Sequence, residues 1–548
     1  MPTRDTKEGQ QKNSLTARLK ALRDFVADYR KNRKDELFRY SVLVLVGLLS
    51  ALVIQDPVVA LQESGGFGYF LGSFLLITFI LFIFFKDIKR YKPAYLNDNK
   101  MMLLLGILIT GTLSQARLFG YLLSGLHRGF EMPVGESFVF GIPLPVGAVL
   151  VALMFDFHLA IIFSFVMSLL AGIWFYNPFY PVYAFVGSLT AAFCVFRCKR
   201  RSTLIKAGFV VSAVSVITVA VILLMKGDLF GPSARSTFLF AAISGILVSA
   251  IVSIVLPVIE YIFGIKTDIS LVELLDHDQP LMRSLMINAP GTYHHSVIVG
   301  NLVESAAEAV GANPLLARVS AHYHDIGKMK MPEYFIENQS SGDSKHDKLT
   351  PTMSSMVLIN HVKEGVDLAR QHKLPQPVID IIEQHHGTSL MTYFYQKAKD
   401  LRPESPPLEE KYRYPGPRPQ TRVAALVMMG DAVEAASRTL NEPTPARIAA
   451  LVEKIINNVY LAGQIDECEL TLKDISEIKK RFTYILTTVL HRRIEYPELQ
   501  LKKIAARDER GAYPHGNGSG SKGQPKTDKD RPPVDREATQ EGSQELNP

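Results

Sequence analysis

The chain has 548 residues, more than one hydrophobic core usually serves, so two or three structural units are expected. Its three cysteines, Cys194, Cys198 and Cys468, form no framework of pairable thiols, which excludes a disulfide scaffold and indicates free thiols in a reducing compartment. The net charge of +7 does not indicate binding to a nucleic acid polymer, because the basic residues gather beside hydrophobic runs, where membrane topology accounts for them.

Long apolar runs fill residues 40–264, and each predicts a helix that crosses a lipid bilayer, which takes roughly 20 mostly apolar residues. The eight expected spans are about 40–57, 67–85, 101–123, 137–155, 157–176, 179–196, 203–225 and 236–264. The first is the weakest, because Gln55 and Asp56 end it early. A cleaved signal peptide is its alternative reading, disfavoured by the polar segment 1–39 before it and by the lack of a small-residue cleavage site.

Lysines and arginines orient these spans, because basic residues are retained on the cytoplasmic side. With eight spans, three basic clusters fall on that one side: Arg30, Lys31, Arg33, Lys34 and Arg39; Lys86, Lys89, Arg90 and Lys92; and Arg197, Lys199, Arg200 and Arg201. Both termini are then cytoplasmic, and the protein is expected in the inner (plasma) membrane. Arg117 and His158 could mark a permeation path, but both sit near span ends, where snorkelling is the preferred account.

The segment 265–289 is expected to link the membrane helices to a soluble half. Ser270 with Glu273 predicts a capping box that starts a short helix through about Leu275. The linker is either a plain connector, the preferred reading, or a lever for signals. From Pro290 onward the pattern predicts nearly continuous helix: from Asn313 to Gly327, from Pro351, from about 377 to 387, and from about 421 to 438. The fold class is therefore all-α.

Seven histidines and aspartates in this soluble half predict a metal centre: His295, His324, Asp325, His361, His385, His386 and Asp431. The pairs at 324–325 and 385–386 are expected in the last turns of their helices, where both side chains can turn into one cavity. His295 shares a helix face with apolar residues and points inward. A single histidine is usually a surface or satisfied core residue, and His322, His346 and His372 are placed in that class.

The residue types favour a hydrolytic centre with two metal ions. Imidazole nitrogens and carboxylate oxygens suit iron, manganese or zinc, and the absence of cysteine argues against a structural zinc site. Asp325 beside His324 is placed to bridge two ions. Two ions about 3.5–4 Å apart can activate a hydroxide and hold both oxygens of a phosphoryl displacement, so phosphoester hydrolysis is indicated. Lys328 is either a catalytic phosphate contact or a solvated charge at a helix end, with equal weight.

The motifs GTYHHS (291–296), HDIGK (324–328) and QHHGTSL (384–390) resemble the HD-domain phosphohydrolase superfamily. ENQ (337–339), YFY (393–395), RYPGPRPQT (413–421) and DAVEAASR (431–438) look like the membrane-bound seven-helix HD family, whose PgpH-type members hydrolyse the second messenger cyclic di-AMP. The resemblance covers about residues 86–500 and implies a cyclic dinucleotide substrate, manganese or iron, and linear pApA as product.

The resemblance also implies a ligand set. One ion would be held by His295, His324, Asp325 and Asp431, and the second by Asp325, His361, His385 and His386. All seven positions are filled, so no dead site is indicated. Family members typically carry a large extracellular domain after the first span, whereas about ten residues, near 56–66, fill that gap here. A ligand-sensing ectodomain is therefore not expected.

The expected organisation is a basic cytoplasmic segment 1–39, a transmembrane domain 40–264, a helical linker 265–289, an HD phosphohydrolase domain 290–500 and a disordered tail 501–548, rich in Gly, Pro, Ser and charge. A homo-oligomer is compatible with these features and not required by them. Two alternatives stay open: a non-enzymatic receptor that binds a cyclic nucleotide through the HD domain, and a transporter with a regulatory HD domain.

Overall fold

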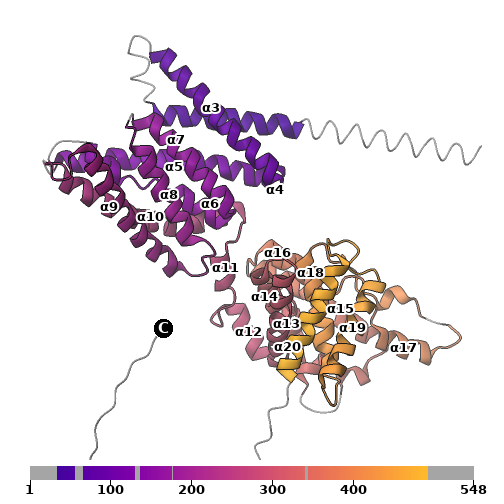
Figure 1. Ribbon diagram of the computed structural model, residues 1–548. Helices are drawn as coiled ribbons and strands as arrows, with labels where there is room; N and C mark the ends of the chain where they lie inside the picture. Colours follow the sequence, from indigo (N-terminus) through magenta and orange to yellow (C-terminus); the bar gives the residue numbers. More distant parts are fainter. Residues whose placement is uncertain are drawn as a thin grey trace, which may run out of the picture. The chain divides into compact units, whose positions relative to one another are not determined.

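The computed structural model describes residues 34–55, 66–129, 136–175, 177–339, 344–405 and 407–490. The expectations for the N-terminal segment up to residue 33, the link at 56–65 and the C-terminal tail lie outside these residues. Within them the chain forms α-helices and short 3-10 helices (Figure 1), and a lone antiparallel bridge joins Leu390 to Arg413. The all-α prediction is confirmed.

Each of the eight expected spans contains helix among the described residues, and seven of these helical segments are long and apolar enough to cross a membrane. These are Lys34–Ile54, α3 (Gly66–Tyr91), α5 (Asn99–Gly129), Ser137–Met154 (which joins η1, Glu136–Gly141, to α6, Val146–Met154), α7 (Phe157–Phe175), α9 (Arg201–Lys226) and α10 (Ala234–Phe263). The expected sixth span, α8 (Tyr180–Val195), has only 16 residues. The three basic clusters lie on the same side of the membrane only if α8 also crosses it. The topology with eight crossings therefore stays a prediction.

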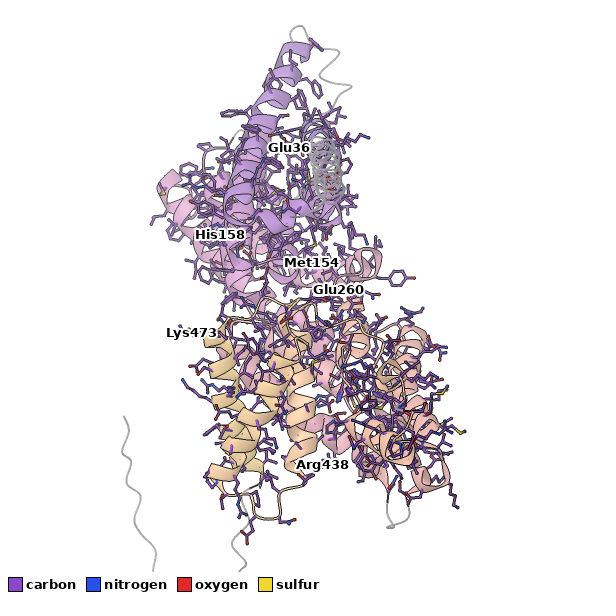
Figure 2. The ribbon with its side chains drawn as sticks, turned by 90° about the vertical axis from the view of Figure 1, so that its right-hand side faces the viewer. Glu36, Met154, His158, Glu260, Arg438 and Lys473 are labelled. Carbon is purple, nitrogen blue, oxygen red and sulfur yellow. The ribbon has the colours of Figure 1, made fainter. Side chains whose placement is uncertain are left out.

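Both polar residues considered for a permeation path have local partners. The Arg117 guanidinium donates to the carbonyls of Leu52 and Gln55, each at 3.3 Å, and so caps the end of the first helix. His158, labelled in Figure 2, is the second residue of α7, and its Nε2 is 3.8 Å from a carboxylate oxygen of Asp87. Helix capping accounts for Arg117 without a pathway.

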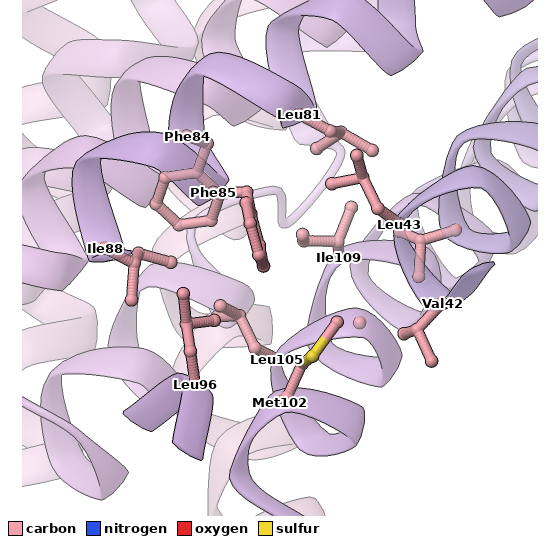
Figure 3. A pocket seen from close by; sticks show the side chains of 12 residues that line it. Val42, Leu43, Leu81, Phe84, Phe85, Ile88, Leu96, Met102, Leu105 and Ile109 are labelled. Atoms are coloured by element: carbon pink, nitrogen blue, oxygen red, sulfur yellow. The ribbon is translucent and has the colours of Figure 1, made fainter. Parts of the chain in front are cut away.

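A small pocket opens between the first helix, α3, α4 (Pro93–Asn97) and α5 (Figure 3). Its volume is about 40 Å³, and every side chain that lines it is apolar. A ligand site usually has a few converging polar groups in a cavity of roughly 300–1,000 Å³. This pocket is therefore a packing gap.

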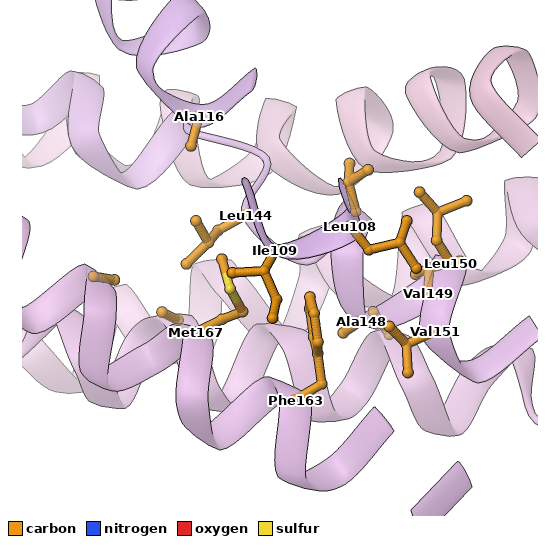
Figure 4. Close-up of a cluster of buried hydrophobic side chains, with 14 of the residues drawn as sticks. Leu108, Ile109, Ala116, Leu144, Ala148, Val149, Leu150, Val151, Phe163 and Met167 are labelled. Atoms are coloured by element: carbon orange, nitrogen blue, oxygen red, sulfur yellow. The ribbon is translucent and has the colours of Figure 1, made fainter. Parts of the chain in front are cut away.

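The segment Ser137–Met154, which ends in the short helix α6, is the most buried of the seven candidate spans, at 83% against 22% for α3. Figure 4 shows side chains of α5, α6 and α7 that point toward one another: Leu108, Ile109, Val149, Val151, Phe163 and Met167. Small residues bring α9 and α10 together, since a Cβ atom built at Gly245 would lie 2.3 Å from the carbonyl oxygen of Gly208. Close backbone approach of this kind is typical of membrane helix pairs.

The linker forms two helices, α11 (Asp268–Glu273) and α12 (Pro280–Asn288). The predicted capping box at Ser270 is wrong, because α11 already begins at Asp268. The buried Glu260 carboxylate provides the start signal, since it accepts hydrogen bonds from the Thr267 backbone N–H at 3.0 Å and hydroxyl at 2.5 Å. The partner therefore comes from the preceding helix α10, which a local capping pattern does not reveal.

The soluble part contains nine helices among the described residues, interrupted by 3-10 turns. They are α12, α13 (Pro290–Ala309), α14 (Pro314–Tyr323), α15 (Pro351–Gln371), α16 (Gln376–Gln384), α17 (Thr392–Leu401), α18 (Arg422–Ser437), α19 (Pro445–Leu461) and α20 (Leu472–Leu490). The predicted caps are present: Asn313 accepts from the Leu316 N–H at 2.9 Å, and Thr421 accepts from the Ala424 N–H at 3.2 Å.

Two apolar cores hold this part together. One joins α13, α18, α19 and α20, and the other joins α12, α14, α15 and α16. Two residues labelled in Figure 2 mark helices of the first core: Lys473 lies near the start of α20, and Arg438 directly follows the end of α18. The helix α18 is buried on almost all sides and contributes residues to the first core along most of its length.

Candidate metal centre

The seven predicted residues come from five helices and meet in one place. His295 lies in α13, His361 in α15 and Asp431 in α18, whereas the pairs at 324–325 and 385–386 follow the last residues of α14 and α16. The prediction that the pairs occupy the last helical turns is wrong by one or two residues. A 3-10 helix, η2 (Ile326–Lys330), begins directly after Asp325, so the chain turns there.

These residues form two groups of four that share Asp325. One group is His295, His324, Asp325 and Asp431, the other is Asp325, His361, His385 and His386, and within each group the candidate ligand atoms lie within 4.8 Å of one another. The structure thus brings together every residue of the predicted set, in the predicted partition.

The two oxygens of Asp325 face different groups. Its Oδ2 lies 3.5 Å from His295 Nε2 and 3.1 Å from His324 Nε2. Its Oδ1 lies 3.4 Å from His361 Nε2 and 3.7 Å from His385 Nε2. This carboxylate therefore has the geometry of a bridge between two cation positions.

Backbone carbonyls orient three of the histidines. The Nδ1 atoms of His324, His361 and His385 lie 2.7, 2.5 and 2.7 Å from the carbonyl oxygens three residues earlier. Because a carbonyl can only accept, each Nδ1 carries the proton, and in a neutral ring each Nε2 directs its lone pair at the centre. His295 is oriented in the same way by the Glu434 carboxylate, which contacts its Nδ1.

The donor atoms of the centre are placed as expected for metal ligands, and their placement would be unfavourable in a site that never holds a cation. His324 Nε2 and both oxygens of Asp325 are buried without a hydrogen-bond partner of suitable geometry among the described residues. His361 Nε2 and His385 Nε2 face each other at 3.3 Å. Converging lone pairs and buried carboxylate oxygens are costly unless a cation lies between them. An all-nitrogen and oxygen donor set suits manganese, iron or zinc.

The electrostatics of the centre point the same way. Burial opposes the charged forms, but the Asp325 carboxylate overcomes it and raises the pKa of His324 to about 10. Conversely, His324 and Lys328 overcome burial and hold the pKa of Asp325 well below its usual range. The carboxylates are thus ionised and need positive partners. A metal ion that binds here takes over the role of the proton on His324, since metal-ligating imidazoles are neutral.

Lys328 is not a solvated charge. Its side chain is 13% exposed, and its Nζ lies 2.7 Å from Asp325 Oδ2 and 2.9 Å from Glu337 Oε1. The same ammonium sits 5.0 Å from the centre of the Phe335 ring. Lys328 therefore joins the shared carboxylate of the centre to a second carboxylate outside it.

Two supporting carboxylates were not predicted as site residues. Glu434 holds His295 and is itself held by Arg438, whose Nη2 lies 2.8 Å from its Oε1. Its position one helical turn after Asp431 was the available signal. Glu337 holds Lys328 and accepts from the Thr292 hydroxyl at 3.1 Å, although only its motif had been noted.

The histidines predicted to lie outside the site do lie outside the two groups. His322 Nδ1 is 2.8 Å from the Arg318 carbonyl, and burial lowers the pKa of its ring to about 4. His346 donates its Nε2 proton to the Tyr334 carbonyl at 2.8 Å. His372 follows the end of α15.

Comparisons with known proteins agree on both parts of the chain. Residues 67–267 match the family model described as a 7TM receptor with intracellular HD hydrolase, and residues 292–436 match the HD domain model. Cyclic-di-AMP phosphodiesterase PgpH of Bacillus subtilis (strain 168) is 35% identical over 471 residues, which cover 84% of this chain and 63% of that protein. Its namesake in Listeria monocytogenes serotype 1/2a is 42% identical over 301 residues, 55% of this chain and 42% of that protein.

Among solved structures, the HD domain of L. monocytogenes phosphodiesterase PgpH is 44% identical in sequence to this chain. The match covers 39% of this chain and 100% of the crystallised domain, with a TM-score of 0.37. The same domain has been crystallised in complex with cyclic-di-AMP, also at 44% identity, with 39% and 99% coverage and a TM-score of 0.38. The chain thus spans less than two thirds of the full-length relatives but the whole of this solved domain.

Proposed function

This chain belongs to the family of 7TM receptors with an intracellular HD hydrolase, and we propose that it is a membrane-anchored, metal-dependent phosphodiesterase that hydrolyses a cyclic dinucleotide. The proposed substrate is cyclic di-AMP and the proposed product is pApA. The substrate is inferred from the relatives that bear the name cyclic-di-AMP phosphodiesterase and from the complex of the Listeria HD domain with cyclic-di-AMP.

One observation carries the proposal: two four-residue groups share Asp325, with one carboxylate oxygen directed at each group. When bound, two divalent ions, manganese or iron in this proposal, supply Lewis acidity at a phosphate and a water of lowered pKa. His295, His324 and Asp431 complete one position, and His361, His385 and His386 complete the other. A structure that only bound a nucleotide would have no need of both.

The residues around the ligands have roles that follow from their contacts. Lys328 places a fixed positive charge beside Asp325, 2.7 Å from its Oδ2, where the negative charge of a phosphate has to be balanced. Tyr414 covers the outer side of His386, with its ring stacked at 4.2 Å between centroids. We assign Lys328 to phosphate contact and Tyr414 to shielding the second position from bulk water.

The catalytic half is proposed to face the cytoplasm of a bacterial cell. The support comes from the basic residues at the inner ends of the expected spans and from the family model, which describes an intracellular hydrolase. Lys89 and Arg90 lie in the last turn of α3, and Arg201 begins α9. Cytoplasmic nucleotides are then directly available to the centre.

The proposal is tested with the full-length chain purified in detergent. Loaded with Mn²⁺ or Fe²⁺, it should convert cyclic di-AMP to pApA, separable by chromatography, and should hydrolyse cyclic di-GMP more slowly. The Asp325→Asn variant serves as the control for contaminating phosphodiesterases and should be inactive. A folded, metal-loaded chain that binds cyclic di-AMP without releasing pApA would contradict the proposal and favour the receptor alternative.

A further inference from the structure

The His386 ring differs from the other candidate imidazole ligands, because no hydrogen bond orients it among the described residues. Its Nδ1 lies 3.7 Å from Asp431 Oδ2, too far for a hydrogen bond. The other four imidazoles are each held at Nδ1 by a carbonyl or a carboxylate. The direction of the His386 ring therefore depends on the backbone that carries it. We infer that Gln464 is a positioning residue, which holds this backbone and thereby completes the second metal position. The inference rests on the proposed function and deepens it.

The chain turns directly after His386. Gly387 has a φ of +51°, a left-handed conformation that favours glycine, and its N–H donates to the Gln384 carbonyl at 2.9 Å. The Ser389 N–H in turn donates to the His386 carbonyl at 3.0 Å. His386 is thus part of a tight turn, and a shift of that turn would move its ring.

Gln464 holds the turn at Thr388. Its Oε1 accepts the Thr388 backbone N–H at 2.9 Å and the Thr388 hydroxyl at 3.2 Å, while its Nε2 donates to the same hydroxyl oxygen at 3.1 Å. Gln464 is 3% exposed, so the loss of these partners would leave a buried polar group unpaired, which is costly. A Cβ atom built at Gly387 would lie 2.6 Å from Gln464 Oε1, so the amide is packed directly against the turn.

A second side chain holds the same turn from the carbonyl side. Arg413 Nη1 donates to the Thr388 carbonyl at 2.9 Å. The neighbouring Tyr414 N–H donates to the Ser389 carbonyl at 3.0 Å, and the Tyr414 ring stacks on His386 at 4.2 Å between centroids. The backbone after His386 and the ring that covers it are therefore fixed together.

Gln464 reaches the turn from the other apolar core. It lies in the turn after α19, its N–H donates to the Val459 carbonyl at 3.2 Å, and the next residue, Ile465, is buried in the first core. His386 follows α16, which belongs to the second core. The hydrogen bonds between Gln464 and Thr388 thus join the two cores beside the centre. Because His386 belongs only to the second group of ligands, the first metal position should not depend on Gln464.

The test compares Gln464→Leu with Val452→Ala in the full-length chain. The leucine has no polar atoms for Thr388, whereas Val452 is fully buried in the first core and its truncation lowers stability without touching the turn. Mn²⁺ is titrated in the absence of substrate and followed by electron paramagnetic resonance, since two ions that share a carboxylate are exchange-coupled and a single ion is not.

Wild type and Val452→Ala should each take up two coupled ions. Gln464→Leu should bind the first ion with wild-type affinity and the second about 10- to 100-fold more weakly, so that the spectrum of a single ion appears at low Mn²⁺. Excess Mn²⁺ should restore its turnover of cyclic di-AMP with an unchanged KM, because every ligand is still present. Equal weakening of both ions would overturn the assignment to the second position.

Thr388 provides a milder pair of variants, which carries the test if Gln464→Leu does not fold. Thr388→Val loses the hydroxyl and keeps the N–H, so its second ion should bind more weakly than in wild type, whereas Thr388→Ser keeps both groups and should retain the affinity. Unchanged second-ion affinity in Gln464→Leu, or in Thr388→Val where it replaces that variant, overturns the inference, and the proposed function stands if the wild type hydrolyses cyclic di-AMP. Two bound ions without wild-type turnover would overturn the proposed function alone.

Discussion

At the scale of single residues, Asp325 determines the layout of the centre. It is 1% exposed, and each of its oxygens faces one of the two ligand groups. The remaining candidate ligands each belong to one group. Loss of Asp325 should therefore affect both positions, whereas loss of any other ligand should leave one group of four intact.

Replacing Asp325 and Asp431 by alanine should separate the two positions. Asp325→Ala removes a ligand from both groups and should abolish tight binding of both ions, whereas Asp431→Ala removes a ligand only from the first and should retain one ion. Elemental analysis of the purified variants gives the metal content per chain. Retention of one ion by Asp325→Ala, with none in Asp431→Ala, would reverse the assignment.

The Glu434 carboxylate acts through His295. Glu434→Gln weakens the acceptor that holds His295 Nδ1, so the affinity of the first metal position should fall about 10- to 100-fold. Metal titration monitored by competition with a chelator measures this. Glu442→Gln is the control, because the Glu442 side chain is 70% exposed and pairs only with Arg447 among the described residues. Equal affinities in the two variants would count against the role of Glu434.

At the scale of elements, the ligand pairs mark the points where helices stop. α14 ends at Tyr323 and α16 at Gln384, and in both cases the next two residues are candidate ligands. After Asp325 the chain passes directly over α15, where a Cβ atom at Gly327 would lie 1.9 Å from the His361 carbonyl oxygen. The close contact between η2 and α15 places His324 and Asp325 opposite His361.

Gly327→Ala should disrupt this contact. The added methyl group meets backbone atoms of α15, which cannot move independently, so the soluble part should lose roughly 1–3 kcal/mol or more of stability, together with metal affinity. Gly365→Ala is the comparison, since its Cβ meets the Ile382 side chain at 3.0 Å and gains helix propensity. Thermal unfolding of both variants checks the difference. A Gly327→Ala chain as stable as Gly365→Ala would show that η2 can shift at little cost.

At the scale of the whole molecule, the chain combines an apolar helical part with a more polar helical part that contains the candidate metal centre. The expected topology requires the 16-residue helix α8 to cross the membrane along with the seven longer helices. A crossing by so short a helix is reasonable where neighbours bury it, and eight of its residues are buried. The division into domains at about residues 40, 265, 290 and 500 stays a prediction.

Cysteine labelling tests this topology. In a chain with Cys194, Cys198 and Cys468 changed to serine, Phe230→Cys should react with a membrane-impermeant maleimide in intact cells, because Phe230 is 95% exposed in the loop between α9 and α10. Glu404→Cys, in the soluble part, should react only after permeabilisation. The reverse pattern would mean that the orientation drawn from the basic residues is inverted.

The sequence alone was sufficient for the all-α class and for the apolar helices, and it proposed the seven candidate ligands that the structure brings together, because hydropathy, helix caps and residue types are local properties. It was insufficient where partners come from distant segments. Glu260 sets the start of α11, and Glu434 orients His295 from 139 positions away. Likewise, His324 and Asp325 leave their helix early because η2 packs on α15, a contact that no spacing reveals. The residue types thus indicated which metal ions the centre could bind, whereas the packing of five helices decided that one carboxylate lies between both groups.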